Sequence, residues 1–103
     1  MVVEKGLMMA KLTDFEIKEL LPGILGWEAI EEDGMKRLQK SFSFGDFTDA
    51  LAFTNRVGEL AETADHHPRI TIEWGNVTLT WWSHDQGGMV AADIEMAKRV
   101  DAL

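Results

Sequence analysis

The chain has 103 residues, which fits a single domain, and 46% of them are hydrophobic, enough for one core. Eighteen acidic residues against ten basic ones give a net charge of −8 with neutral histidines. This balance disfavours a nucleic-acid surface, because phosphates are bound through Lys and Arg. The absence of cysteine excludes disulfides, thiolate nucleophiles and cysteine-bound metal clusters.

The sequence contains no signal for a membrane or for secretion. Its apolar stretches are far shorter than the ~18 residues that a membrane span needs. The start, from Met1 to Lys5, lacks the charged head and long apolar middle of a signal peptide. We therefore expect a soluble, cytoplasmic protein with a loose lead-in over residues 1–12 and one domain over residues 13–103.

The first half of the domain predicts a helix followed by a hairpin. A capping box over residues 13–16 predicts the start of a short helix, which the Pro22-Gly23 pair ends. Residues 27–32 and 36–44 have the character of two strands. Between them, Asp33-Gly34 predicts a tight turn, because both residues tolerate positive φ.

The second half predicts a long helix, another hairpin and a last helix. Asp46 is the expected N-cap of the long helix, in which apolar residues recur every three or four positions. Pro68 should end that helix near residue 65 or 66. Strands are predicted over residues 70–74 and 77–83, around Gly75-Asn76, and the last helix from about Val90 to the end.

The order is therefore helix, two strands, helix, two strands, helix. Short hairpins with a helical crossover predict an α+β domain, because neighbouring strands joined by tight turns pair antiparallel. We expect a single four-stranded antiparallel sheet with three helices packed on one face.

Three histidines fall at the ends of these elements. His66 and His67 lie where the long helix ends, and His84 follows the last strand. A single histidine in such a place is usually a solvated loop residue. Three of them at the ends of different elements raise the hypothesis of a shared site.

Carboxylates accompany the histidines. Glu62 precedes His66 by four residues, one helical turn if the helix persists, and Asp65 is adjacent. Asp93 falls in the first turn of the last helix, where the helix dipole favours an anion. Trp27, at the start of a strand, is either a core residue or a wall for a flat ligand.

Two chemistries fit histidines next to carboxylates. They can bind a metal ion, but His66 and His67 are adjacent and the regular helical pair of histidines is missing. The alternative is metal-free acid–base catalysis, because imidazole gains and loses a proton near neutral pH. Carboxylates would then orient the rings or stabilise their protonated form.

The motif Glu62-Thr63-Ala64-Asp65-His66-His67-Pro68, followed by His84 and Asp93, resembles the signature of the pterin-4a-carbinolamine dehydratase family. The resemblance covers roughly residues 13–103 and includes further segments: Leu21-Pro22-Gly23, Gly26-Trp27, Phe42-Ser43-Phe44, Asp46-Phe47 and Phe53 to Val57. The chain departs from the family at Val90, where Ser or Thr is frequent, and at Ala92, where animal members carry Arg.

The resemblance implies an activity, the removal of water from 4a-hydroxytetrahydropterin to give quinonoid dihydropterin. This reaction recycles the cofactor of aromatic amino-acid hydroxylases, so it implies a functional link to phenylalanine hydroxylase. It needs no metal and no organic cofactor. The resemblance also implies homodimers that extend the sheet edge to edge, and tetramers in animal members.

The expected site residues follow from the same motif. We assign the proton transfers to His66 and His84, and substrate positioning or a share of the transfers to His67. Glu62 and Asp93 are expected to orient the imidazoles and balance their charge. The supporting positions complete the expected site: Asp65, Pro68 and Trp27.

Two other functions remain open. A non-catalytic pterin-binding or protein-interaction module could use the same scaffold, although such a surface does not need three titratable histidines. A small metal-binding protein is the other alternative, and metal analysis would separate it.

Overall fold

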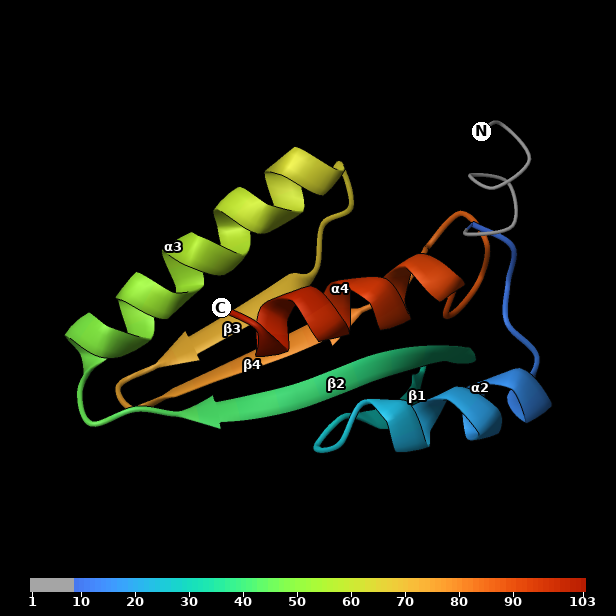
Figure 1. Cartoon of the computed structure of the whole chain (residues 1–103), viewed down its shortest axis with the longest axis horizontal. Coiled ribbons are helices and arrows are strands. Elements are labelled where there is room, and N and C mark those ends of the chain that lie inside the picture. Colours follow the sequence, from blue (N-terminus) through green and yellow to red (C-terminus); the bar gives the residue numbers. More distant parts are fainter. Residues whose placement is uncertain (1–8) are drawn as a thin grey trace.

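The computed structural model describes residues 9–103. Its elements run α2 (Asp14–Leu20), a 3-10 turn (Leu21–Gly23), β1 (Glu28–Glu32), β2 (Met35–Ser43), α3 (Phe47–Ala64), β3 (Arg69–Glu73), β4 (Asn76–Trp81) and α4 (Ala91–Asp101). The predicted order of elements over this range is confirmed (Figure 1). Among the helices of residues 9–103, none combines the length and hydropathy that a bilayer crossing requires.

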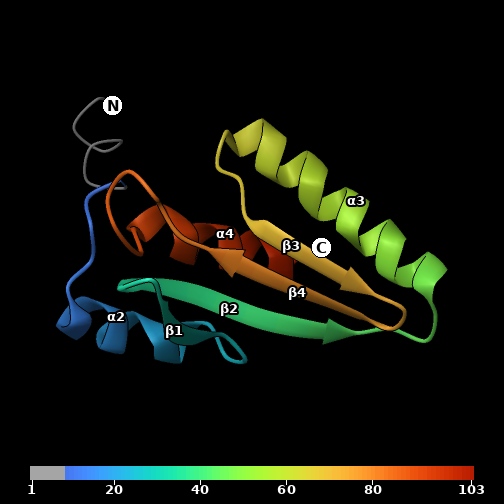
Figure 2. The same ribbon diagram turned by 180° about the vertical axis from the view of Figure 1, so that it is seen from behind.

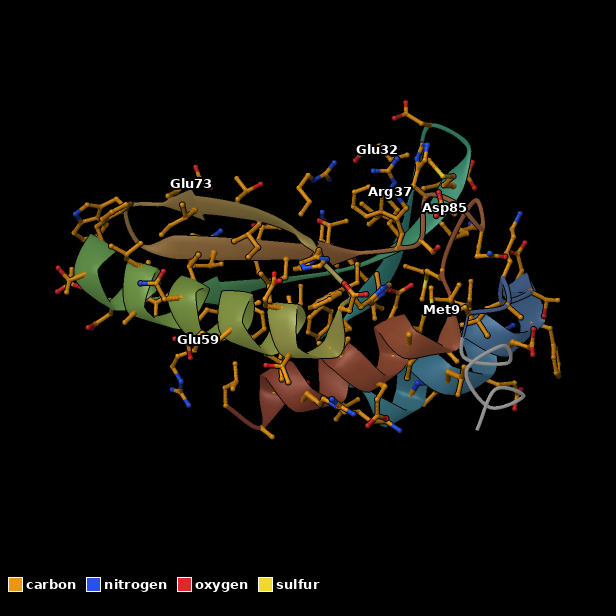
Figure 3. The ribbon with its side chains drawn as sticks, turned by 90° about the horizontal axis from the view of Figure 1, so that it is seen from above. Met9, Glu32, Arg37, Glu59, Glu73 and Asp85 are labelled. Atoms are coloured by element: carbon orange, nitrogen blue, oxygen red, sulfur yellow. The ribbon has the colours of Figure 1, made fainter. Side chains whose placement is uncertain are left out.

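The strands form one antiparallel sheet in the order β1-β2-β4-β3. The two hairpins are therefore joined at the centre, where β2 pairs with β4, and β1 and β3 are the edges. Figure 2 shows this sheet from behind, and Figure 3 shows that the helices lie on one side of it. The predicted fold class is confirmed.

The core lies between the sheet and the helices because alternate strand residues point to opposite faces. Leu38, Leu79 and Trp81 are fully buried on the helix side. The long helix adds its own buried stripe, formed by Ala50, Val57 and Ala61. Two other apolar residues of the helix, Phe47 and Leu51, are exposed.

Local signals set most of the element ends. Thr13 and Glu16 form the predicted capping box, and the side chain of Asp46 accepts a hydrogen bond from Asp49 N–H as N-cap of α3. Asp33 and Gly34 both have positive φ, at 53° and 74°. The second hairpin turns at residues 74–75, one position earlier than predicted, because Asn76 already pairs with Ser43 in the sheet.

The predicted lead-in over residues 1–12 falls mainly on residues 1–8, which lie outside the described residues. Its last part is held against the domain. Lys11 forms an isolated bridge with Val90, and Leu12 N–H donates to the carbonyl of Met89 at 2.8 Å. Leu12 also packs against the core, and this apolar contact stabilises the position of the segment.

Candidate functional site

The end of α3 turns the chain sharply at Asp65. This residue has left-handed backbone geometry, with φ 51°, and its N–H donates to the carbonyls of Ala61 and Glu62. The N–H of His66 donates to Ala61 in turn, at 3.1 Å. These bonds satisfy the last helical carbonyls, as in other left-handed helix ends. The reversal turns His66 away from the helix axis, and Pro68 then leads into β3.

His66 and Asp93 form a buried pair. The distance from His66 Nε2 to Asp93 Oδ1 is 2.5 Å, and the side chains are 12% and 0% exposed. The other oxygen, Asp93 Oδ2, accepts a hydrogen bond from Val90 N–H at 2.9 Å. Because both oxygens are occupied, this buried carboxylate joins the end of α3 to the beginning of α4.

The His66 ring is also held from one side. It stacks on the indole of Trp81, with centroids 5.6 Å apart and planes inclined by 20°. Trp81 is the last residue of β4 and is fully buried. The sheet therefore supplies a rigid aromatic surface that sets the plane of the imidazole.

His67 and Glu62 form a second, exposed pair. His67 Nε2 lies 3.0 Å from Glu62 Oε2, and the side chains are 54% and 80% exposed. From the sequence, Glu62 was expected one helical turn from His66. The helix ends at Ala64, however, so the turn at Asp65 presents His67 to Glu62 instead.

The sheet register brings His84 to the same end of the domain. Arg69 at the start of β3 pairs with Thr80 near the end of β4. The segments before β3 and after β4 therefore leave the sheet together, and they carry His67 and His84. His84 is exposed in a turn that its own carbonyl closes by accepting from Gly87 N–H at 3.1 Å.

Trp27 is placed elsewhere. It is buried in the core against Phe42, and its Nε1–H donates to Asp101 Oδ2 at 2.9 Å. Asp101 ends α4 and Asp93 lies near its beginning. Their eight-residue separation corresponds to about 12 Å of helix, at ~1.5 Å per residue. The structure therefore does not bring Trp27 to His66.

A cluster of charged side chains lies on the face of the sheet away from the helices, near the histidines. Glu32 of β1 accepts hydrogen bonds from Arg69 of β3, at 2.7 and 3.1 Å, and from Arg37 of β2. The Arg37 guanidinium stacks 3.9 Å from the centroid of Trp82. The hydrogen bonds from Arg69 lower the pKa of Glu32, and those bonds raise the pKa of Arg69. This cluster spans the sheet just beyond His67.

A small pocket of about 210 Å³ lies beside His66, between the end of α3 and α4. Its other lining residues are Ala64, Ala92, Glu95, Met96 and Arg99. No sequence pattern marks the last three as site residues. A larger hollow, of about 620 Å³, lies between β2, α3 and the end of α4, but no histidine lines it. Within residues 9–103, no group of three or more His, Asp and Glu side chains is arranged to hold a metal ion.

Comparison with known proteins agrees with these features. The family model for pterin 4 alpha carbinolamine dehydratase matches residues 10–103. The chain belongs to this family. Two relatives provisionally named pterin-4-alpha-carbinolamine dehydratases come from Chlorobium limicola and Nitrosococcus oceani. The Chlorobium limicola protein is 52% identical to this chain, and the match covers 85% of this chain and 78% of that protein. The Nitrosococcus oceani protein is 50% identical, and the match covers 90% of this chain and 82% of that protein.

Solved structures share the fold. A transcriptional coactivator/pterin dehydratase from Brucella Melitensis superposes with a TM-score of 0.81 at 34% identity, over 89% of this chain and 96% of that one. A pterin dehydratase-like protein, identified as a RuBisCO assembly factor in the alpha-carboxysome, gives a TM-score of 0.62 at 28% identity. This second match covers 75% of this chain and 87% of that chain. A protein with a similar fold is therefore described by a role in assembly.

The two histidine–carboxylate pairs predict different effects on stability. Asp93→Asn should lower the free energy of unfolding by about 1–3 kcal/mol, because the amide can accept only one of the two buried hydrogen bonds. Glu62→Gln should change it by less than about 0.5 kcal/mol, because that pair is exposed. Urea unfolding of both variants measures the difference. Equal effects would contradict the structural role given to Asp93.

Proposed function

We propose that this protein dehydrates 4a-hydroxytetrahydropterin to quinonoid dihydropterin by metal-free histidine acid–base catalysis. The observation that carries the proposal is the buried His66–Asp93 pair in a chain of this family. Asp93 occupies Nε2 of the imidazole, which leaves Nδ1 as the ring nitrogen that can exchange a proton with a substrate. A buried carboxylate behind an imidazole serves in the same way in other enzymes, where it orients the ring and stabilises its protonated form.

The reaction needs two proton transfers. The C4a–O bond breaks as the leaving hydroxyl gains a proton and departs as water. The proton on N5 passes to a base, and the N5 lone pair forms the new double bond to C4a. No electrons are gained or lost overall, so the residues of the chain can supply all that the reaction needs.

The different surroundings of the three histidines support different roles for them in the proton transfers. With its proton on Nε2 facing Asp93, neutral His66 presents Nδ1 as an acceptor, which suits the base that takes the N5 proton. His84 and His67 are more exposed and can exchange protons readily with water, which suits delivery of a proton to the leaving hydroxyl. Glu62 positions His67, and Asp65 with Pro68 sets the turn that carries both neighbouring histidines.

Trp27 acts from a distance in this proposal. It anchors the end of α4 through Asp101 and so fixes the helix that carries Asp93. We place the reaction in the cytoplasm, where it would recycle tetrahydropterin for a hydroxylase such as phenylalanine hydroxylase. The absence of cysteine and the acidic surface charge are compatible with that location.

A protein-interaction role is the second candidate, because one structural relative is identified as a RuBisCO assembly factor. That role would not need three titratable histidines at the ends of different elements, so His66, His67 and His84 favour the enzyme.

The purified protein should accelerate the dehydration of 4a-hydroxytetrahydropterin, followed by the absorbance of the quinonoid product. The rate should be unchanged in excess EDTA, because no step in the proposal uses a metal ion. If the folded protein leaves the uncatalysed rate unchanged, the proposed enzyme activity is wrong. Activity lost in EDTA and restored by a metal ion would overturn the metal-free mechanism.

Replacement of the proton carriers should separate chemistry from folding. His66→Gln keeps a donor for Asp93 but cannot transfer protons, so turnover should fall by roughly 10²–10⁴. The turnover of His84→Ala should fall by a similar factor, and the turnover of the double variant should fall further. Circular dichroism should show native structure in each. Wild-type turnover in both single variants would refute the assignment.

We also propose that the protein forms a homodimer or homotetramer. The edge strands β1 and β3 leave backbone groups unpaired, which invites pairing with a second copy. Large apolar side chains, Phe47 and Leu51, are exposed on α3. Light scattering at micromolar concentration should give about two or four times the chain mass of 11.6 kDa. A mass of one chain would contradict this proposal.

A further inference from the structure

A single carboxylate connects the two edge strands of the sheet. Glu32 ends β1 and Arg69 begins β3, and the strands β2 and β4 lie between them in the sheet. The two side chains meet in a two-pronged contact, in which Arg69 Nη1 donates to Glu32 Oε2 at 2.7 Å and Arg69 Nη2 donates to Oε1 at 3.1 Å. Figure 3 shows Glu32, together with Arg37, on the side of the sheet away from the helices. The contact therefore crosses the open face of the sheet.

Glu32 also holds a buried arginine of the neighbouring strand. Arg37 is 4% exposed, and it donates to Glu32 Oε2 and to the Glu32 backbone carbonyl, at 3.3 Å in each case. Both guanidinium groups lie over the indole of Trp82, with their central carbons 3.9 Å (Arg37) and 5.5 Å (Arg69) from the ring centroid. Such contacts are attractive within about 6 Å. One carboxylate thus balances the charge of two arginines that hold one indole.

The arginine end of this arrangement leads to His67. Only Pro68 separates it from Arg69, and the proline ring fixes the backbone angle φ, so the connection is stiff. The side chain of His67 is exposed, and it pairs with Glu62, which is more exposed still. An exposed pair of this kind holds a side chain weakly. The position of His67 therefore depends on the backbone that Arg69 anchors.

The indole end leads to His84. Trp82 precedes this histidine by two residues, and the residue between them, Ser83, exchanges backbone hydrogen bonds with Gly88 at 2.9 and 3.1 Å. This bridge makes the connection from Trp82 to His84 stiff as well. A displacement of the indole is therefore passed on to the start of the turn that carries His84.

Building on the proposed function, we propose that Glu32 is a positioning residue that sets the spacing between His67 and His84. It acts through Arg69 on one side and through Trp82 on the other. Exposed ion pairs contribute little to stability as a rule, but a carboxylate that binds a guanidinium fork with both oxygens fixes its direction. The hydrogen bonds from Arg69 also lower the pKa of Glu32, which keeps the carboxylate charged at neutral pH.

Two variants keep every charge but disturb the two-pronged contact. Glu32→Asp withdraws the carboxylate by one methylene, and Arg69→Lys replaces the fork by a single ammonium. In both variants Arg37 keeps its contacts with the backbone carbonyl of residue 32 and with Asp33, so circular dichroism should show native structure. Loss of native structure in both variants would make the contact a requirement for folding and would overturn the inference.

The ring signals of the three histidines in NMR spectra report their positions without any catalysis. In spectra of the full chain, both variants should shift the signals of His67 and His84. The signal of His66 should stay in place, because that ring is held separately by Asp93 and Trp81. Signals of His67 and His84 that stay at their wild-type positions in both variants would contradict the inference.

Kinetics tests the consequence for the proposed reaction. The kcat of either variant should fall roughly 10-fold, because proton carriers displaced by less than about 1 Å already react more slowly. KM should change much less, the pattern expected when the lost interaction serves only the transition state. The double variant should be no slower than the slower single variant, because both changes break one contact. Effects that multiply in the double variant would rule out a shared contact.

Glu31→Asp is the matched control. Glu31 precedes Glu32 in β1, points to the opposite face of the sheet and pairs with Lys36 at 3.3 Å. The same shortening at this neighbouring position should leave the histidine signals and kcat at their wild-type values. An equal effect in Glu31→Asp would overturn a specific role for Glu32.

The two measurements separate this inference from the proposed enzyme activity. If the wild type does not dehydrate its substrate, the proposed activity is wrong, and the histidine signals alone decide whether Glu32 positions the imidazoles. If the wild type dehydrates its substrate and both variants keep its kcat, the inference is wrong and the proposed activity stands.

Discussion

The carboxylate of Asp93 is the constraint on which the rest of this domain depends. A buried charge is costly unless it is paired and hydrogen-bonded, and here both oxygens have partners. One partner belongs to the turn after α3 and the other to the start of α4. The two helices therefore cannot be placed independently. Val90 has no polar side chain with which to cap α4, so Asp93 satisfies that helix end from inside the helix.

Side chains of the sheet fix the position of the groups around the His66–Asp93 pair. Trp81 supports the His66 ring from the core side, and on the opposite face Glu32 links Arg37 and Arg69 across the strands. Both contacts lie at the end of the sheet where the histidine segments emerge. Rigid elements with locked side chains hold reactive groups more accurately than loops do. His67, by contrast, is exposed, and its partner Glu62 is exposed as well.

Periodicity and turn chemistry were enough to predict the elements. Val77, Leu79 and Trp81 alternate along β4 and are all buried. The Asp33-Gly34 pair forms the predicted turn between β1 and β2. The partner of Glu62 could not be predicted, because it depends on where α3 ends and on the reversal at Asp65. Glu95 and Arg99 also gave no signal, because a charged face of a terminal helix has the same pattern whether it borders solvent or a pocket. Trp27 shows the same limit: its partner, Asp101, is 74 positions away.

The left-handed backbone of Asp65 has a consequence for how this family can vary. Non-glycine residues rarely adopt that conformation, and Asn, Asp and Gly tolerate it best. A β-branched residue there would be strained in the conformation that presents His66 and His67. Such a replacement would displace both imidazoles while leaving every site side chain chemically intact. Relatives that keep all three histidines but carry Val or Ile at this position would thus hold the same imidazoles in a different arrangement, so the residue at position 65 bears on the geometry of this site as the histidines bear on its chemistry.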